Sequence, residues 1–412
     1  MFGSLYVRLF QDPHTIETLV PRWDELLSEF DGATVFSTWG WLGAWWRAFG
    51  GSQRLLILGF FDQSERLVGL APLMQETRPL YGGLQLRILR LLGDGSGDSD
   101  NLDLPVRRGY ENAFVTSLLD WLQNQSDEWD LCELNTLPTD SPALPRLQMR
   151  ARALGWNLFQ CERPRLIVHL PQSWDAYLNQ LSSEDRHNLP RYARRLQRRY
   201  RVLFHKCRAQ AELPGALETL FQLHQMRWRA RGEPGTFCSR ARRSFYRQMS
   251  RGLLAKGFLE FWSLSLDGEP AAAQFAMRYG DTVFQLQEGF DPRHSGDRVG
   301  YVLRGHILQQ LIAGGVRHYD FLGGRAAHKS RWHAQERSYI TIRLARHYSL
   351  ATMYASWAHH SDAGKERLRM CLPSRAWLAL HRINSRFNKA EDEYTSASPD
   401  GNARIYRGRS LP

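Results

Sequence analysis

The segment between Leu259 and Trp332 constrains the fold most, because its hydrophobic pattern changes period within a short distance. Three runs rich in aliphatic and aromatic residues come first, and Gly/Asp pairs at 267–268 and 280–281 separate them. Strand-like runs broken by such turn signals predict an antiparallel meander. The three predicted strands are 259–266, 271–279 and 282–290.

The pattern becomes helical after a polar loop at 291–300. Apolar residues then recur at Leu303, Ile307 and Leu311, which is the spacing of a helix that packs on a sheet. The glycine pair 314–315 ends this helix, and 316–322 reads as a further strand. A crossover of this kind places the new strand parallel to the strand before the loop.

The loop 293–300 opens a helix directly after a strand. Free backbone N–H groups and the helix dipole make such a place attractive to phosphate, and Arg293 and Arg298 would add charge. The segment is not a nucleotide P-loop, because no Gly-Lys-Ser/Thr follows, and it is not a dinucleotide fingerprint, because hairpin strands precede it. An ordinary surface loop before a helix is equally compatible with the pattern.

Several short motifs occur in a fixed order along the chain, at 36–45, 191–195, 298–303, 314–323 and 328–332. In the order of its elements the sequence resembles the GNAT acyltransferase superfamily. In these motifs it resembles more closely the acetyltransferase family that includes the cellulose-biosynthesis CelD proteins, which is related to FemAB-type transferases. Where those relatives have Ser-Pro-Gly, this chain has Arg-Val-Gly at 298–300.

The resemblance implies that acetyl-CoA, or another acyl-CoA, is the co-substrate and that its pyrophosphate lies on the loop before the central helix. In GNAT relatives a backbone N–H on the preceding strand binds the thioester carbonyl, which corresponds to 287–289 here. The expected donor-binding residues are Gln287, Gly289, Arg293, Arg298, Val299, Gly300 and Tyr301.

Acyl transfer to an amine needs a group that removes a proton and a donor that stabilises the carbonyl oxygen. Glu288 is the first candidate base, directly or through water, and Asp320 could orient or deprotonate the acceptor. Lys329 matches the lysine of the family motif and could hold an anionic group or the developing oxyanion. Each of the three is also compatible with an ordinary ion pair at a strand end.

Four further side chains near this segment could take part. His328 and His333 titrate near neutrality and are alternative bases, and Tyr301 and Tyr339 could protonate the departing thiolate. Neither of these two histidines has a partner at metal-ligand spacing, and no metal is expected.

The first part of the chain repeats the same order of elements. A hairpin at 54–74, a strand at 84–92, a loop, a helix at 110–123 and a strand at 130–137 follow one another. We therefore predict an α/β (α+β) fold of tandem GNAT-like units, each a mixed, mostly antiparallel sheet flanked by helices. The expected domains are an N-terminal GNAT-like unit at 1–160, an acyl-CoA-binding unit at 161–345, and a basic helical extension with a disordered tail at 346–412.

The loop of the first unit, 93–100, carries Asp94, Asp98 and Asp100 where the second unit has arginines. A flexible acidic loop would repel CoA phosphates, so the donor is expected on the second unit. The first unit either shapes the acceptor cleft or only completes the fold. Tryptophans 39, 41, 45 and 46 could line a groove, but a buried core position is favoured for such a cluster.

The charge balance favours an anionic partner. The net charge is +12, and the predicted helix 183–200 is dense in arginine, which suits either a phosphate-binding face or a solvated basic one. Five widely spaced cysteines favour a reducing compartment. The N-terminus does not read as a signal peptide, and no apolar run approaches the ~18 residues that span a bilayer, so a cytoplasmic protein is expected.

Taken with the resemblance, these features predict an acyl-CoA-dependent N-acyltransferase. The acceptor would be a small-molecule or glycan-linked amine, such as an amino sugar in envelope or exopolysaccharide metabolism, and the polysaccharide-synthesis machinery is a possible partner. Two alternatives remain open: a FemAB-like transferase that uses aminoacyl-tRNA, and a non-catalytic accessory protein of polysaccharide synthesis. Nucleic acid is expected as a partner only in the tRNA alternative.

Overall fold

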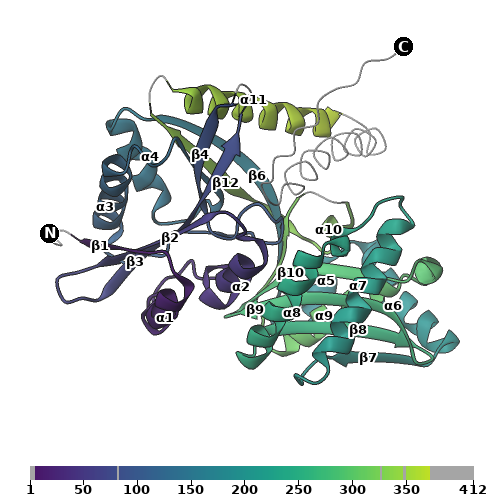
Figure 1. The fold of residues 1–412 in the computed structure, drawn as a ribbon. Helices are drawn as coiled ribbons and strands as arrows, with labels where there is room; N and C mark the ends of the chain where they lie inside the picture. Colours follow the sequence, from purple (N-terminus) through teal and green to yellow (C-terminus); the bar gives the residue numbers. More distant parts are fainter. Residues whose placement is uncertain (1–4, 81–82, 325–326, 347–348, 372–412) are drawn as a thin grey trace, which may run out of the picture. The chain divides into compact units, whose positions relative to one another are not determined.

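The computed structural model describes residues 5–80, 83–324, 327–346 and 349–371, without the side chains of 327–328 and 362–371 (Figure 1). The chain divides into a compact unit of residues 1–355 and a second unit of 356–412, to which the end of α11 (Leu350–Cys371) belongs. The part of the extension and tail predicted at 346–412 that follows residue 371 lies outside the described residues. Within the described ranges, every helix is too short or too polar to cross a membrane.

Twelve strands form one sheet in the order β1-β2-β3-β4-β5-β12-β6-β11-β10-β9-β8-β7. We call the first six of these strands the first half and the last six the second half. The first half consists of β1 (Tyr6–Phe10), β2 (Arg54–Phe61), β3 (Leu67–Pro79), β4 (Gln85–Leu91), β5 (Leu131–Pro138) and β12 (Gln335–Ala345). The second half consists of β6 (Asn157–His169), β11 (His318–Gly323), β10 (Thr282–Phe290), β9 (Glu269–Tyr279), β8 (Leu259–Leu266) and β7 (Val202–Lys206).

The two halves repeat one arrangement, as the tandem prediction requires. In the first half an antiparallel meander, β2-β3-β4, leads through α3 (Glu111–Asn124) to β5, which lies parallel to β4. In the second half the meander β8-β9-β10 leads through α9 (Val299–Ala313) to β11, which lies parallel to β10. The predicted meander, helix and parallel crossover are therefore confirmed.

The halves exchange one strand each, which the sequence did not predict. In the chain, β6 comes after β5 and the other early strands of the first half, but it pairs with β11 of the second half. β12 comes after β11 and the other strands of the second half, but it pairs with β5 of the first half. The two exchanged strands also pair with each other along eleven residues, from Gln335 opposite Ile167 to Ala345 opposite Asn157. The sheet is therefore continuous across the middle.

Two segments between these elements complete the sheet. β6 is long, running from Asn157 to His169. The segment 101–106 contributes only a single bridge, between Val106 and Gly69.

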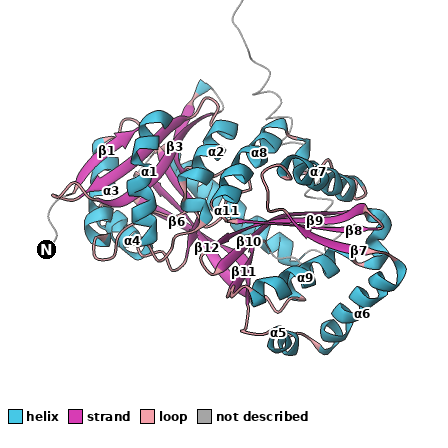
Figure 2. Ribbon diagram, turned by 90° about the horizontal axis from the view of Figure 1, so that it is seen from below, coloured by secondary structure: helices cyan, strands magenta, loops and turns pink. Residues whose placement is uncertain are grey.

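Helices cover both faces of the second half (Figure 2). α7 and α8 lie on one face, and α5, α6 and α9 lie on the other, where their apolar side chains form a separate core cluster. The helix bounds are α1 Pro13–Ser28, α2 Trp39–Phe49, α4 Leu144–Ala153, α5 Trp174–Gln180, α6 Ser183–Arg199, α7 Leu213–Arg229, α8 Arg240–Ala255 and α10 Ala327–Ser330. Short 3-10 helices lie at Val35–Ser37, Thr236–Cys238 and, as η4, at Pro292–Asp297.

The tryptophan cluster of α2 belongs to the core. Trp41 and Trp45 are buried, and their indole N–H groups donate to the loop that follows β4, at Ser99 (3.0 Å) and Ser96 (2.9 Å). Asp98 of the same loop is buried against Arg242 of α8, with 2.7 Å between Oδ2 and Nε. The acidic loop predicted to be flexible is therefore fixed in place against the second half.

Candidate active site

The parallel strands β10 and β11 separate soon after they begin to pair. Their register covers three positions, from Thr282 opposite His318 to Phe284 opposite Asp320. A bulge at Gln285–Gln287 then interrupts the pairing of β10 with β9 on its other side. Beyond this point the two strands border a cavity instead of pairing with each other, and β10 also borders another cavity.

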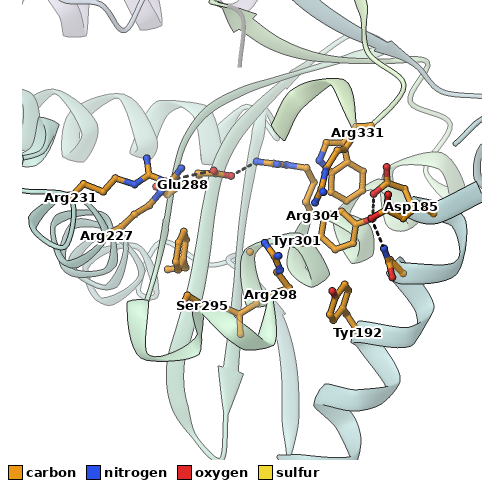
Figure 3. Close-up of a pocket in the computed structure, with 16 residues that line it drawn as sticks. Asp185, Tyr192, Arg227, Arg231, Glu288, Ser295, Arg298, Tyr301, Arg304 and Arg331 are labelled. Atoms are coloured by element: carbon orange, nitrogen blue, oxygen red, sulfur yellow. Dashed lines mark hydrogen bonds and ion pairs between the residues drawn. The ribbon is translucent and has the colours of Figure 1, made fainter. Parts of the chain in front are cut away.

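The first cavity, which we call the α9 cavity, has a volume of about 320 Å³ and lies at the start of α9 (Figure 3). Side chains from α6, α7, β10, the loop before α9 and the segment after α10 surround it. Positive charge exceeds negative charge in its lining. The lining arginines are Arg227, Arg231, Arg298, Arg304 and Arg331, and the acids are Glu184, Asp185 and Glu288.

The residues of the turn into α9 line this cavity. Arg298 adopts a left-handed conformation with φ of 58°, which is uncommon for a residue with a Cβ and sets the sharp entry into the helix. The N–H groups of Val299 and Gly300 donate to no acceptor among the described residues. Amides at the start of a helix, with a guanidinium beside them, form an anion-binding geometry.

The predicted donor-binding residues divide into two groups. Arg298, Val299, Gly300 and Tyr301 all line the α9 cavity. Arg293 is not among the described lining residues, because its side chain is 79% exposed and pairs with Asp291 at 2.6 Å. Burial, together with a hydrogen bond to Asp185 (3.2 Å), raises the pKa of Tyr301.

The second cavity, which we call the β11 cavity, has a volume of about 270 Å³ and lies where β10 and β11 diverge. Residues 285–288 of β10 and 321–323 of β11 form two of its walls, and α7 forms a third with His224 and Trp228. The loop of the first half closes it with Gly97 and Asp100. The first half therefore contributes directly to a cavity in the second half.

Glu288 lies between the two cavities and lines both of them. Its carboxylate accepts hydrogen bonds from Arg227 of α7, at 2.9 Å, and from Arg304 of α9 (Figure 3). Arg304 is only 4% exposed, and burial opposes its charge, but Glu288 together with Tyr319 and Tyr177 outweighs burial, so the pKa of Arg304 rises. Glu288 thus holds two guanidinium groups at the boundary between the cavities.

The other predicted strand residues have mainly internal contacts. Gln287 lines the β11 cavity. Gly289 packs against the backbone of α7, since a Cβ there would lie 2.4 Å from the amide nitrogen of His224. Gly300 is not crowded in this way, because a Cβ there would lie 3.8 Å from Phe290.

Asp320 and Lys329 stabilise the end of β11. Asp320 is buried, accepts from the amide of Leu322 at 2.7 Å and lies 3.6 Å from Arg165, and burial raises its pKa. It is not among the described residues that line the two cavities. Lys329 does line the β11 cavity, but its ammonium donates to three backbone carbonyls, those of Phe321, 323 and 324, at 3.0 to 3.2 Å.

Sequence reasoning missed three residues of this site. Asp100 accepts from the amide of Gly323 at 2.9 Å, and burial raises its pKa to about 6. Nothing in the sequence places this loop residue beside β11. Arg227 and Arg304 were also missed, although an arginine inside the apolar run of α9 is itself a signal, because a buried charge needs a partner.

Comparisons with known proteins agree with this geometry. Residues 183–330 match the model of a family described as an acetyltransferase (GNAT) domain. This segment runs from α6 to α10 and includes most of the lining of both cavities. A search of curated protein sequences gave no match. The match supports a GNAT domain and does not reach the CelD-like assignment, which stays a prediction.

Solved structures with the same fold extend over most of the chain. FemX aligns with a TM-score of 0.57 at 11% identity, over 82% of this chain and 98% of that one. A protein of unknown function from Bacteroides thetaiotaomicron aligns with a TM-score of 0.51 at 10% identity, over 83% of this chain and 100% of that one. At these identities the likeness concerns the fold, and it confirms the predicted mixed α/β architecture.

Proposed function

We propose that this protein is an acyl-CoA-dependent N-acyltransferase that binds the acyl donor in the α9 cavity and an amine acceptor in the β11 cavity. One observation carries the proposal: residues at the start of α9 whose amides donate to no described acceptor line an arginine-rich cavity, and this cavity meets a second one between separating parallel strands. The family match over residues 183–330 supports it independently.

On the donor side, the amides of Val299 and Gly300 and the guanidinium of Arg298 would bind the pyrophosphate. Arg227, Arg231 and Arg331 would add charge elsewhere in the α9 cavity. The thioester would then reach the segment 287–289 of β10, which follows the bulge and lies beyond the pairing with β11, as a source of N–H groups for the carbonyl oxygen.

On the acceptor side, the β11 cavity combines an aromatic wall with amide and carboxylate side chains. Trp228, Gln285 and Gln287 line it together with Asp100 and Lys329. Such a lining suits a polar amine that carries hydroxyl groups, of which an amino sugar is an example. The amino-sugar class rests on the resemblance to CelD-like proteins, and this lining is compatible with it.

Asp100 is our preferred proton acceptor. A carboxyl group with a pKa near 6 is mostly ionised at neutral pH and retains some basicity, which suits general base catalysis. Glu288 remains the second candidate, although both of its oxygens already accept from guanidinium groups. In this proposal Asp320 and Lys329 act by positioning the end of β11, where Gly323 donates to Asp100.

The first test is donor binding by isothermal titration with acetyl-CoA, followed by release of the CoA thiol in the presence of a panel of amino sugars and other primary amines. We expect saturable binding and transfer to at least one amine. Absence of both binding heat and a thermal shift with acetyl-CoA would refute the proposal.

The second test separates the two candidate bases. For Asp100→Asn we expect kcat to fall about 100-fold, with loss of the rate increase that the wild type shows as pH rises through about 6. Glu288→Gln should change the KM for the donor more than kcat, because it releases Arg227 and Arg304. The opposite pattern would assign the base role to Glu288.

A FemAB-like transfer from aminoacyl-tRNA is the second candidate function. The arginine-dense helix α6 favours it, because its exposed guanidinium groups could bind an RNA backbone. A transfer assay with charged tRNA tests it, and salt-sensitive RNA binding alone would not be sufficient. The third reading, an accessory protein, would be supported if Gly300→Asp combined with Lys329→Ala left polysaccharide acetylation in cells unchanged.

A further inference from the structure

The face of α6 that borders the α9 cavity changes charge along its length. Glu184 and Asp185 line the cavity near the start of the helix, and Tyr192 lines it two turns later. Steps of three and four residues stay on one side of a helix, so the same face continues to Arg195 and Arg199. The helix therefore carries acids at one end of the cavity and arginines beside the loop that enters α9.

A buried aspartate fixes these two arginines against that loop. Asp297 is the last residue of η4, directly before Arg298, and is 7% exposed. Its Oδ1 accepts from Arg199 at 2.6 Å and from Arg195 at 3.4 Å. Its Oδ2 accepts from the hydroxyl of Tyr200 at 3.3 Å and lies 3.5 Å from Nδ1 of His294.

Positive charge remains after this pairing, because two guanidinium groups face one carboxylate. The side chains of Arg195 and Arg199 are 50% and 49% exposed, so part of each fork faces solvent. A guanidinium has five N–H donors in a planar fork that matches phosphate oxygens. A carboxylate so close to a phosphate-binding loop would weaken anion binding unless cations of this kind neutralised it.

We propose that Arg195 and Arg199, held by Asp297, form a second anion subsite at the rim of the α9 cavity. It binds the phosphate that CoA carries on its adenosine ribose, while the start of α9 binds the pyrophosphate. This inference rests on the proposed function, because it assigns a peripheral part of the same donor. It makes the protein selective for acetyl-CoA over acetyl-3′-dephospho-CoA, which lacks only that phosphate.

The experiment compares the two donors by titration and by KM in four proteins: the wild type, Arg195→Gln, Arg199→Gln and a control, Arg198→Gln. Arg198 is an exposed neighbour on the same helix, and the structure gives it no contact with Asp297. We expect the wild type to prefer acetyl-CoA at least about tenfold, as charge-assisted hydrogen bonds to phosphate would give. Arg199→Gln, and more weakly Arg195→Gln, should bring the ratio of the affinities for the two donors toward one without changing kcat. The control should behave like the wild type.

The outcomes separate this inference from the proposed function. Equal affinity of the wild type for both donors would overturn the subsite and leave the acyltransferase proposal standing. An equal loss of affinity for both donors in Arg199→Gln would also overturn it, since the arginine would then only position the loop. Failure of the wild type to bind either donor would instead refute the proposed function on which the subsite rests.

Discussion

The two halves of the sheet differ in what lies beyond their short parallel strand pairs. In each half two parallel strands pair over three residues, β4 with β5 and β10 with β11. The first half fills the region beyond this pairing with ion pairs of its own. The second half leaves the β11 cavity there, and this cavity meets the α9 cavity, whose lining has more arginines than acids.

In the first half, a buried network of ion pairs occupies the region beyond the pairing of β4 with β5. Arg90 pairs with Glu76 (2.9 Å), Asp94 (2.9 Å) and Glu133 (3.0 Å), and Glu133 also pairs with Arg343 of the exchanged strand β12 at 2.5 Å. These charges satisfy one another, so they offer little to a ligand.

The helix that follows repeats the contrast. The first turn of α3 carries Glu111, which accepts from the amide of Gly109 at 3.0 Å. The helix start that would attract an anion therefore already has its own carboxylate. In α9 the corresponding turn carries Val299 and Gly300, without a side-chain acceptor. One repeated fold can therefore give a structural half and a binding half through a few charged residues.

The largest expected effect concerns the network of the first half. Glu133→Gln should lower the free energy of unfolding by about 3 kcal/mol, because it leaves two buried guanidinium groups without their shared anion. Chemical denaturation measures this. Glu128→Gln, which breaks an exposed pair with Arg54, should cost less than about 0.5 kcal/mol. If Glu133→Gln also abolished acetyl-CoA binding, the division into a structural and a binding half would be wrong.

The second prediction places one acid in the same turn of both helices. Gly300→Asp should weaken acetyl-CoA binding about 100-fold, since the carboxylate would occupy the anion site, while an acid near a helix start does not destabilise the helix. Asn112→Asp makes the matched change in α3 and should leave binding unchanged. Titration calorimetry with acetyl-CoA measures the affinity of both variants. An equal loss of affinity in the two would contradict the contrast between the halves.

The third prediction concerns the contact that fixes β10 against α7. Gly289→Ala should destabilise the protein by about 1–3 kcal/mol, because the new methyl group would meet backbone atoms of α7. Gly300→Ala should be nearly neutral, because ordinary contact distance is available there. Thermal unfolding of the two variants compares them directly, and equal loss in both would show that this packing argument fails.

The smallest expected effect is a difference in acid sensitivity. Burial lowers the pKa of His224 to about 4, so the unfolded chain takes up its proton first as pH falls below 6.5. Because of this residue, the free energy of unfolding should fall by about 1 kcal/mol as the pH is lowered from 8 to 5.5. His224→Gln should remove this part of the pH dependence of stability.

The first half should respond to acid in a lower window. Burial works to raise the pKa of Glu133, but Arg90 and Arg343 outweigh it and lower the pKa below 4.5. The stability that this carboxylate contributes is therefore lost only below that value. Denaturation curves of His224→Gln and Glu133→Gln from pH 8 to below pH 4.5 test this. If both substitutions changed the pH dependence of stability in the same pH range, the assignment of separate ranges to the two residues would be wrong.

Local pattern was sufficient for much of the fold. The change from strand to helix period predicted β8 to β11 with α9, and the repeated order of elements predicted the tandem halves. The sequence also allowed an anion-binding start of α9, although an ordinary surface loop was equally compatible with the same pattern.

The remaining features depend on contacts between distant segments. Residues 157–164 mix polar and apolar side chains and include Pro164, so they carry no strand signal, although β12 pairs with them. Asp100 reaches β11 only because the first half packs against the second. Arg304 was hidden by the apolar run around it, and its partner Glu288 lies on another element.

The exchange of β6 and β12 has a consequence for how the molecule is made. The first half needs β12, which ends at Ala345, so a ribosome must synthesise most of the protein before that half can complete its sheet edge. Pairings between such distant segments form slowly and leave an unpaired strand exposed in the meantime. Cutting the gene between the halves should therefore yield two insoluble fragments that recover only when they are refolded together.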